Sequence, residues 1–149
     1  MLGKLNETQI NNLLSSQAIG RIGCSSGTQP YIVPVTYVFD GKYIYGQTHE
    51  GMKLEIMREN PTVCFQVDIL MDMANWQSVL VIGSFEELTG DEARKGRALL
   101  LNRIFPLQTS STVHAHEHEI TTQLEDSNRV KPLMYRILIK EKTGRFEKR

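Results

Sequence analysis

The sequence predicts a mainly β fold of the α+β class, in which about six antiparallel strands close into a small barrel with helices against it. Short β-rich runs follow one another through turn signals rather than alternating regularly with helices, which favours antiparallel pairing. A sheet of that many strands must close, or pack on another layer, to avoid exposed edges. The chain contains no internal repeat or low-complexity stretch, so we expect residues 1–149 to form a single domain.

The composition excludes several classes of partner. The 17 Lys and Arg residues balance 17 Asp and Glu residues, so the chain lacks the basic excess of nucleic-acid-binding proteins. The longest apolar runs, such as 79–82, are far shorter than the roughly 20 residues that span a membrane, and the polar N-terminus has no signal-peptide core. We therefore expect a cytoplasmic protein. Cys24 and Cys64 have no CxxC spacing, which favours reduced core thiols over a disulfide or a metal pair.

The first element is a short helix that ends near Ser16. Asn6 is placed as its N-cap, and Gln9 is placed to complete a capping box. Leu5 and Ile10 stand at the positions of a hydrophobic staple, which fixes the direction in which the chain enters the helix.

A β-hairpin follows. Two β-rich runs cover residues 18–24 and 30–39, with a turn at 25–27 between them. Asp40-Gly41 comes directly after the second run and is a strong hairpin signal, because a two-residue type I′ loop needs φ > 0 at both positions. With these two residues as the loop, the predicted register pairs Phe39 with Lys42, Tyr37 with Ile44, Thr36 with Tyr45 and Val35 with Gly46.

The middle of the chain predicts a short helix and then two strands. Residues 51–60 have helical spacing, which Asn60-Pro61 ends. Strand-like residues 62–70 follow, and after a break at 72–75 a long run from 76 to 88 carries Gly83 as a bulge or bend. On the helix, we expect an apolar side of Met52, Ile56 and Met57 and a solvent side of Lys53, Glu55 and Arg58.

A longer helix and a closing strand complete the pattern. Thr89 to Glu92 read as a capping box that opens a helix through about Ile104, and residues 102–131 are polar and weakly patterned. Residues 133–140 alternate with period two, as a half-buried strand does. The helix residues that we expect to face a core are Ala93, Ala98, Leu99 and Leu101.

Gly46 is a candidate contact for a flat ligand. In the predicted register it lies opposite Val35, so it removes a side chain beside the backbone of residues 35–37. The slot would let a ring approach main-chain N–H and C=O groups. The alternative is an ordinary glycine at a strand bend.

The segment from Thr48 to Lys53 is a candidate anion site. It brings a hydroxyl, Gly51 and an ammonium to the start of a helix, where free N–H groups hold anions. Lys53 stands at the positive end of the helix dipole, which is unfavourable unless an anion lies between them. The alternative is a solvated Lys53 paired with Glu50, and the residues alone leave both open.

His114, His116 and His118 recur at period two and would share one face of an extended segment, a geometry compatible with zinc. The surrounding residues carry little strand signal, so a polar loop without a metal is the favoured interpretation. We therefore predict no metal site.

Five sequence blocks occur in a specific order and spacing, although no single block is decisive. They are Tyr31–Tyr37, Asp40–Tyr45, Glu50–Lys53, Asn60–Phe65 and Trp76–Val79, with Gly83 after the last. Together they resemble the pyridoxamine 5′-phosphate oxidase-related FMN-binding proteins, and most closely the small members that include the nitroimidazole-resistance proteins. The likeness covers roughly residues 8–105 and the closing strand at 135–147.

The resemblance implies a six-stranded antiparallel split β-barrel with flanking helices, a homodimer, and FMN at the subunit interface. It further implies an FMN-dependent oxidoreductase that transfers hydride or electrons between a reduced donor and a small organic substrate. The implied cofactor contacts are Val35, Thr36, Tyr37, Tyr45, Gly46, Gln47, Thr48, Met52 and Lys53, with Trp76, Gln77 and Ser78 reaching the flavin held mainly by the other subunit.

The chain departs from the family pattern at Gln47, where many relatives have a histidine. Glutamine exchanges hydrogen bonds but is no proton donor near neutral pH, so family reactions that need that imidazole lack it here. We also find no arginine and histidine pair for a phosphorylated vitamin, which argues against pyridoxamine phosphate as the substrate. The alternative function is a non-catalytic flavin-, haem- or metal-binding module.

Overall fold

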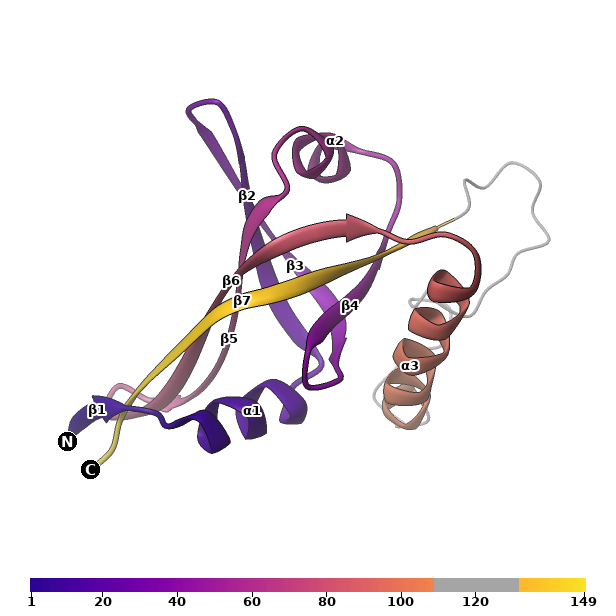
Figure 1. Ribbon diagram of the computed structural model, residues 1–149. Helices are drawn as coiled ribbons and strands as arrows, with labels where there is room; N and C mark the ends of the chain where they lie inside the picture. The colour runs from indigo at the N-terminus through magenta and orange to yellow at the C-terminus, as the bar shows by residue number, and fades with distance from the viewer. Residues whose placement is uncertain (109–131) are drawn as a thin grey trace.

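The computed structural model describes residues 1–108 and 132–149 (Figure 1). Within them, three helices and six strands follow the predicted order, and one extra strand, β1, precedes them. The elements are β1 (Leu2–Lys4), α1 (Glu7–Ser16), β2 (Ile19–Ser26), β3 (Gln29–Phe39), β4 (Tyr43–Thr48), α2 (Met52–Glu59), β5 (Thr62–Asp72), β6 (Asn75–Glu87), α3 (Gly90–Gln108) and β7 (Leu133–Glu147).

The strands form one antiparallel sheet in the order β1-β7-β4-β3-β2-β5-β6, which an additional β6–β7 pairing closes into a barrel. Six strands make up the barrel, as predicted, and β1 is added outside it along the end of β7. Three residues are too few for β1 to show a periodicity in the sequence. The register shifts between Ile82 and Gly83, which confirms the predicted bulge.

The barrel interior is a single apolar core. Tyr37 and Phe65 meet edge to face at its centre, with ring centroids 4.8 Å apart. The Tyr37 hydroxyl donates a hydrogen bond to the Leu14 carbonyl oxygen at 2.6 Å, which ties α1 to the barrel. In Figure 1, α1 lies below the barrel and α2 above it, and both contribute buried leucines to this core.

The start of α1 is as predicted. The Gln9 amide donates to the Asn6 side chain, and the Asn6 amide donates to the Gln9 side chain, both at 2.8 Å. This reciprocal pair is the expected capping box, and the helix ends at Ser16. Cys24 and Cys64 are both free thiols, as expected. Of the helices described, none is long and apolar enough to cross a membrane.

The buried faces of α2 and α3 differ from the prediction. On α2, Met52 is 57% exposed. Ile56 and Met57 are buried as predicted, and Leu54 is buried with them. On α3, Ala98 is exposed and the helix packs through Gly96 and Leu100, one turn apart, because only glycine admits the Tyr45 ring so close to the helix. The helix also continues to Gln108 rather than ending near 104.

The β3–β4 hairpin turns one residue later than predicted, so the predicted register is wrong. Its central residues are Gly41, at φ +101°, and Lys42, closed by a hydrogen bond from the Asp40 amide to the Tyr43 carbonyl. The Asp40 carboxylate accepts hydrogen bonds from the amides of Lys42 and Tyr43, which makes it the residue before the turn. The observed pairs are Tyr37 with Gly46, Val38 with Tyr45 and Phe39 with Ile44.

The slot predicted beside Gly46 is filled by the protein itself. Gly46 lies opposite Tyr135 of β7, and a Cβ on Gly46 would come within 2.4 Å of the Tyr135 hydroxyl oxygen. Tyr135 is almost completely buried. The glycine therefore makes room for an aromatic core residue, and the predicted slot for a flat ligand is wrong.

We expect Gly46→Val to destabilise the fold by about 1–3 kcal/mol, because the valine overpacks against a buried ring that cannot move aside. Chemical denaturation of the purified variant measures this loss. Gly51→Ala is the matched control, since no atom lies within 4 Å of a Cβ at that position. An unchanged free energy of unfolding in Gly46→Val would contradict the packing described here.

Candidate functional site

The start of α2 is an open helix terminus. Gly51 is its N-cap in an extended conformation, and no side chain caps the first turn. Thr48 ends β4 just before it and is one of the few buried polar residues, with its hydroxyl directed to the His49 carbonyl oxygen at 3.2 Å. The first N–H groups of α2 are thus left for water or for an anion, as the sequence predicted.

Lys53 lies in that first turn and has no acidic partner among the described residues. Glu50, the partner considered in the sequence, instead pairs with Arg58, whose two terminal nitrogens lie 3.1 and 3.2 Å from its carboxylate oxygens. Arg58 also contacts Glu87 of β6 at 2.5 Å. The pairing of Lys53 with Glu50 is therefore absent: Lys53 is half-buried, and Glu50 is bound to Arg58 instead.

Partial burial lowers the pKa of Lys53 from its ordinary value, because the ammonium loses contact with water, while the Cys24 thiol of β2 acts weakly in the opposite direction. Burial likewise raises the pKa of Cys24, and the Lys53 charge opposes that shift. The two groups lie on α2 and β2, which pack against each other. A cation that is desolvated without a counter-ion favours binding of an anion beside it.

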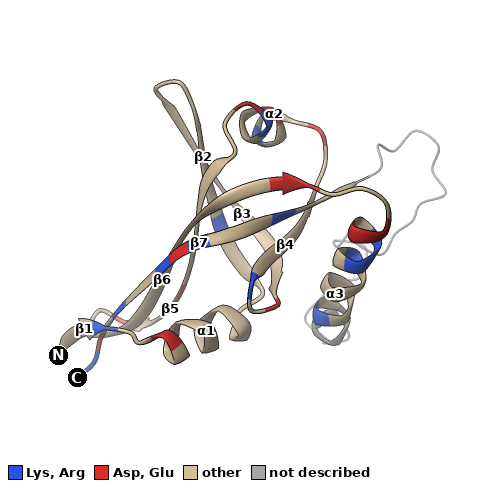
Figure 2. Ribbon diagram, viewed as in Figure 1, with Lys and Arg blue, Asp and Glu red and all other residues tan. Residues whose placement is uncertain are grey.

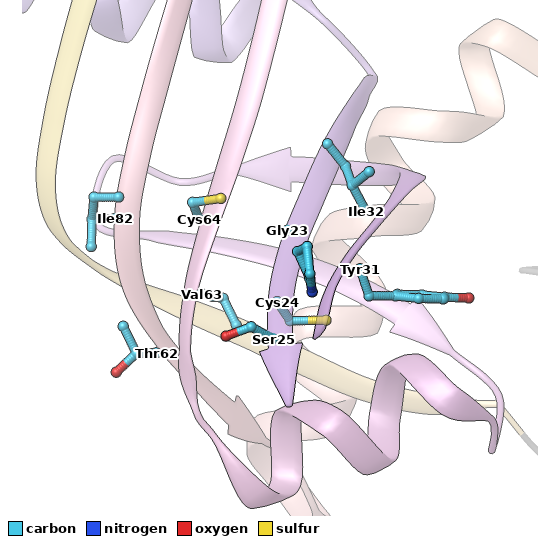
Figure 3. Close-up of a pocket in the computed structure, with 10 residues that line it drawn as sticks. Gly23, Cys24, Ser25, Tyr31, Ile32, Thr62, Val63, Cys64 and Ile82 are labelled. Carbon is cyan, nitrogen blue, oxygen red and sulfur yellow. The ribbon is translucent and has the colours of Figure 1, made fainter. Parts of the chain in front are cut away.

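Cys24 also lines an apolar pocket of about 540 Å³ (Figure 3). In Figure 3 the Cys64 sulfur is directed toward Gly23, and a Cβ on this glycine would lie 2.7 Å from it. Ser25, another lining residue, accepts a hydrogen bond at its carbonyl oxygen from the Asn60 side chain at 3.2 Å, so the pocket adjoins the end of α2. The residues that line it are Gly23, Cys24, Ser25, Pro30, Tyr31, Ile32, Thr62, Val63, Cys64 and Ile82.

The sequence did not predict this pocket. Its floor depends on the pairing of β2 with β5, which places Gly23 beside Cys64 although the two are far apart in the chain. The only local signal is the glycine itself, in a run that otherwise reads as an ordinary strand.

Several predicted cofactor residues have side chains inside the protein. Val35 and Tyr37 point into the barrel core, and Tyr45 packs under α3 in a second core cluster. Thr36 lies on the opposite face of β3, paired with Ile19. The Gln47 side-chain oxygen is buried without a hydrogen-bond partner among the described residues, so it remains an acceptor that a ligand N–H would satisfy.

Trp76, Gln77 and Ser78 lie at the other end of the barrel from Lys53. Ser78 pairs with Asp68 of β5, which lies six residues, or roughly 20 Å, along the strand from Thr62 at the α2 end, and Trp76 pairs with Leu70 further on. Trp76 donates to Glu147 at 3.2 Å, and the Ser78 hydroxyl accepts a hydrogen bond from Gln66 at 3.0 Å. Within one chain, these residues therefore lie away from the α2 end of the barrel that carries Lys53.

A family comparison agrees with this architecture. The model of the family described as pyridoxamine 5′-phosphate oxidase matches residues 6–146, nearly the whole chain. The chain belongs to the pyridoxamine 5′-phosphate oxidase family.

Individual proteins are also similar to this pyridoxamine 5′-phosphate oxidase family member in sequence or in fold. The crystal structure of an FAD-binding protein from Mesorhizobium loti superposes with a TM-score of 0.80 at 25% identity, over 100% of this chain and 98% of that one. A structure described as a candidate 5-nitroimidazole antibiotic resistance protein from Bacteroides thetaiotaomicron has the same fold, with a TM-score of 0.72 at 14% identity over 98% and 87% of the two chains. An uncharacterised Rhizobium meliloti protein is 32% identical over 84 residues, and the match spans 56% of its length and 56% of this chain.

The histidines considered as metal ligands, His114, His116 and His118, lie outside the residues that the structure describes. Within residues 1–108 and 132–149, no three side chains of histidine, cysteine, aspartate or glutamate gather to hold a metal ion.

In this pyridoxamine 5′-phosphate oxidase family member, we expect Lys53→Met to raise the free energy of unfolding by about 0.5–2 kcal/mol at neutral pH. This is the usual gain when a substitution removes an unfavourable group that function requires. Because the pKa of Lys53 is lower in the folded than in the unfolded chain, the ammonium costs stability below the folded pKa, and the gain should vanish as the pH rises past the ordinary value of 10.5. Chemical denaturation of both proteins from pH 7 to 11 measures the difference in their free energies of unfolding.

Lys95→Met is the control, because Lys95 is exposed on α3 and its removal should leave stability nearly unchanged. Loss of stability in Lys53→Met at neutral pH would mean that the ammonium has a stabilising partner in the unliganded protein.

Proposed function

We propose that the protein is an FMN-binding flavoprotein that acts as an oxidoreductase between a reduced donor and a small organic substrate. The observation that carries the proposal is the half-buried Lys53 ammonium, without an acidic partner in the described part of the chain, at the uncapped start of α2. A phosphate monoester is the anion that both features suit, because it accepts hydrogen bonds from N–H groups and neutralises the cation.

The FAD-binding relative from Mesorhizobium loti supports a flavin rather than another phosphate ligand. We favour FMN among the flavins, since its terminal phosphate carries up to two negative charges, whereas each phosphate of FAD carries one. When bound, the flavin would supply hydride or electron transfer. The chain would hold the phosphate through Lys53 and the first turn of α2, and offer the unpartnered Gln47 oxygen as an acceptor.

We also propose that the site is shared between two copies of the chain. Within one chain, Trp76 and Ser78 lie away from the α2 end that carries Lys53, because they pair with Leu70 and Asp68 in the second half of β5. The outer face of β3-β2-β5-β6 carries exposed apolar side chains around the pocket, which is typical of a surface that another protein covers. These include Ile19, Ile32 and Leu80, which are 59%, 67% and 42% exposed. A twofold dimer would place the Trp76 end of one chain against the Lys53 end of the other and form two equivalent sites.

The first experiment is a visible spectrum of the purified protein with FMN. A flavin band that bleaches under a reductant supports the proposal. A haem spectrum or stoichiometric metal without bound flavin would favour the alternative of a haem- or metal-binding module.

Lys53→Ala should weaken FMN binding by about 1.5–3 kcal/mol, the contribution of a hydrogen bond to a charged group. Riboflavin, which lacks the phosphate, should bind both proteins equally. Lys53→Arg keeps the charge and should lose less. Fluorescence quenching measures all the affinities, and equal FMN affinity in wild type and Lys53→Ala would remove Lys53 from the site.

A shared site should also show complementation between two disabled proteins. Lys53→Ala is unfolded and refolded together with the double variant Trp76→Ala, Ser78→Ala. In the heterodimer one site carries all the substitutions and the other none, so part of the tight FMN binding should return. Absence of recovery in verified heterodimers, or a monomer that binds FMN in sedimentation, would rule out the shared site.

A further inference from the structure

A charge network lies directly beside the start of α2 and is not used by the proposed function. Arg58, in the last turn of α2, contacts the Glu50 carboxylate through both terminal nitrogens, at 3.1 and 3.2 Å. The same guanidinium contacts Glu87, at the end of β6, at 2.5 Å. Figure 2 shows this acidic end of β6 beneath α2. Arg58 thus bridges the segment before the helix and the barrel.

Glu50 lies three positions before Lys53, in the segment that leads into α2. Glu55 is closer in sequence, two positions after Lys53, but residues i and i+2 of a helix do not face each other. If its carboxylate turned toward the start of α2, it would have two effects. It would neutralise the Lys53 ammonium, and it would repel a phosphate that carries one and a half to two negative charges. Both effects would weaken the binding of an anion there.

We propose that Arg58 is a positioning residue that holds Glu50 away from Lys53 and so keeps the start of α2 available to a phosphate. This inference rests on the proposed function. The bidentate contact fixes the direction of the Glu50 carboxylate, and the contact with Glu87 fixes Arg58 to the barrel. Such a three-residue network with bidentate geometry holds its members more firmly than an isolated exposed pair.

A direct role of the Arg58 charge would be a different mechanism, because a cation attracts phosphate over a distance without any help from Glu50. The two mechanisms differ in one outcome. If Arg58 acts by holding Glu50, removal of the Glu50 charge makes Arg58 dispensable. If Arg58 acts by its own charge, its loss weakens binding whether or not Glu50 is charged.

The experiment titrates FMN and riboflavin into wild type, Arg58→Gln, Glu50→Gln and the double variant by fluorescence quenching. Arg94→Gln is the matched control, since it removes one exposed positive charge that is paired with Asp91 on α3, away from α2. We expect Arg58→Gln to weaken FMN binding about two- to fivefold relative to Arg94→Gln, the range for exposed ion pairs. Riboflavin binding should stay the same, and the double variant should bind FMN as Glu50→Gln does.

The proposal is overturned if Arg58→Gln binds FMN as Arg94→Gln does, if riboflavin binding weakens equally, or if the FMN loss persists in the double variant. Thermal unfolding of each variant verifies that the fold is intact. Glu87→Gln is a second route to the same test, because it releases Arg58 from the barrel without changing α2. It should also weaken FMN binding. A wild type that binds FMN no better than riboflavin would instead refute the phosphate site itself, before any Arg58 variant is compared.

Discussion

The structure depends on the closure of the barrel by β7. This strand pairs with β4 through its first residues, with β6 along nearly its whole length, and with β1 at its end. The closure aligns the inward side chains of all six barrel strands on one core, in which Tyr37 and Phe65 are central. It also requires local adjustments: Gly46 admits the Tyr135 ring, and the bulge at Gly83 admits the β7 backbone, whose Leu138 carbonyl oxygen would lie 2.4 Å from a Cβ there.

The candidate site results from the packing of the closed barrel rather than from any one sequence motif. The core buries Leu54, so the first turn of α2 is held against β2, where Lys53 loses part of its hydration beside Cys24. The ammonium is kept without a carboxylate although Glu50 is close in sequence. An unfavourable arrangement that the fold maintains is typical of a binding site, because the ligand recovers the free energy that the unliganded protein forgoes.

The elements could be predicted because each carries a local signal: the capping box at Asn6 and Gln9, the alternation in β7, and the glycine at the bulge. The β3–β4 register could not, because Asp40 suits two adjacent positions of a turn and only its hydrogen bonds to the following amides decide between them. The pairing of strands far apart in the sequence could not be predicted either. Tyr135 lies opposite Gly46 and fills the predicted slot. Gly23 lies beside Cys64 and lines a pocket that no sequence motif predicts. The open start of α2 was predicted. Whether Glu50 pairs with Lys53 or with Arg58 depends on the tertiary structure and could not be predicted.

The place of β7 in the chain bears on how the protein folds. The strand that completes the barrel comes after the other barrel strands in the chain, and its described strand pairings are all with residues at least 48 positions earlier, the separation of Tyr135 from Glu87. Before it docks, β4 and β6 each have an unpaired edge that another chain could extend. Contacts of such high sequence separation form slowly, because a long loop must close before any of them is gained. A sheet that lacked β7 would therefore keep two open edges, and open edges favour aggregation.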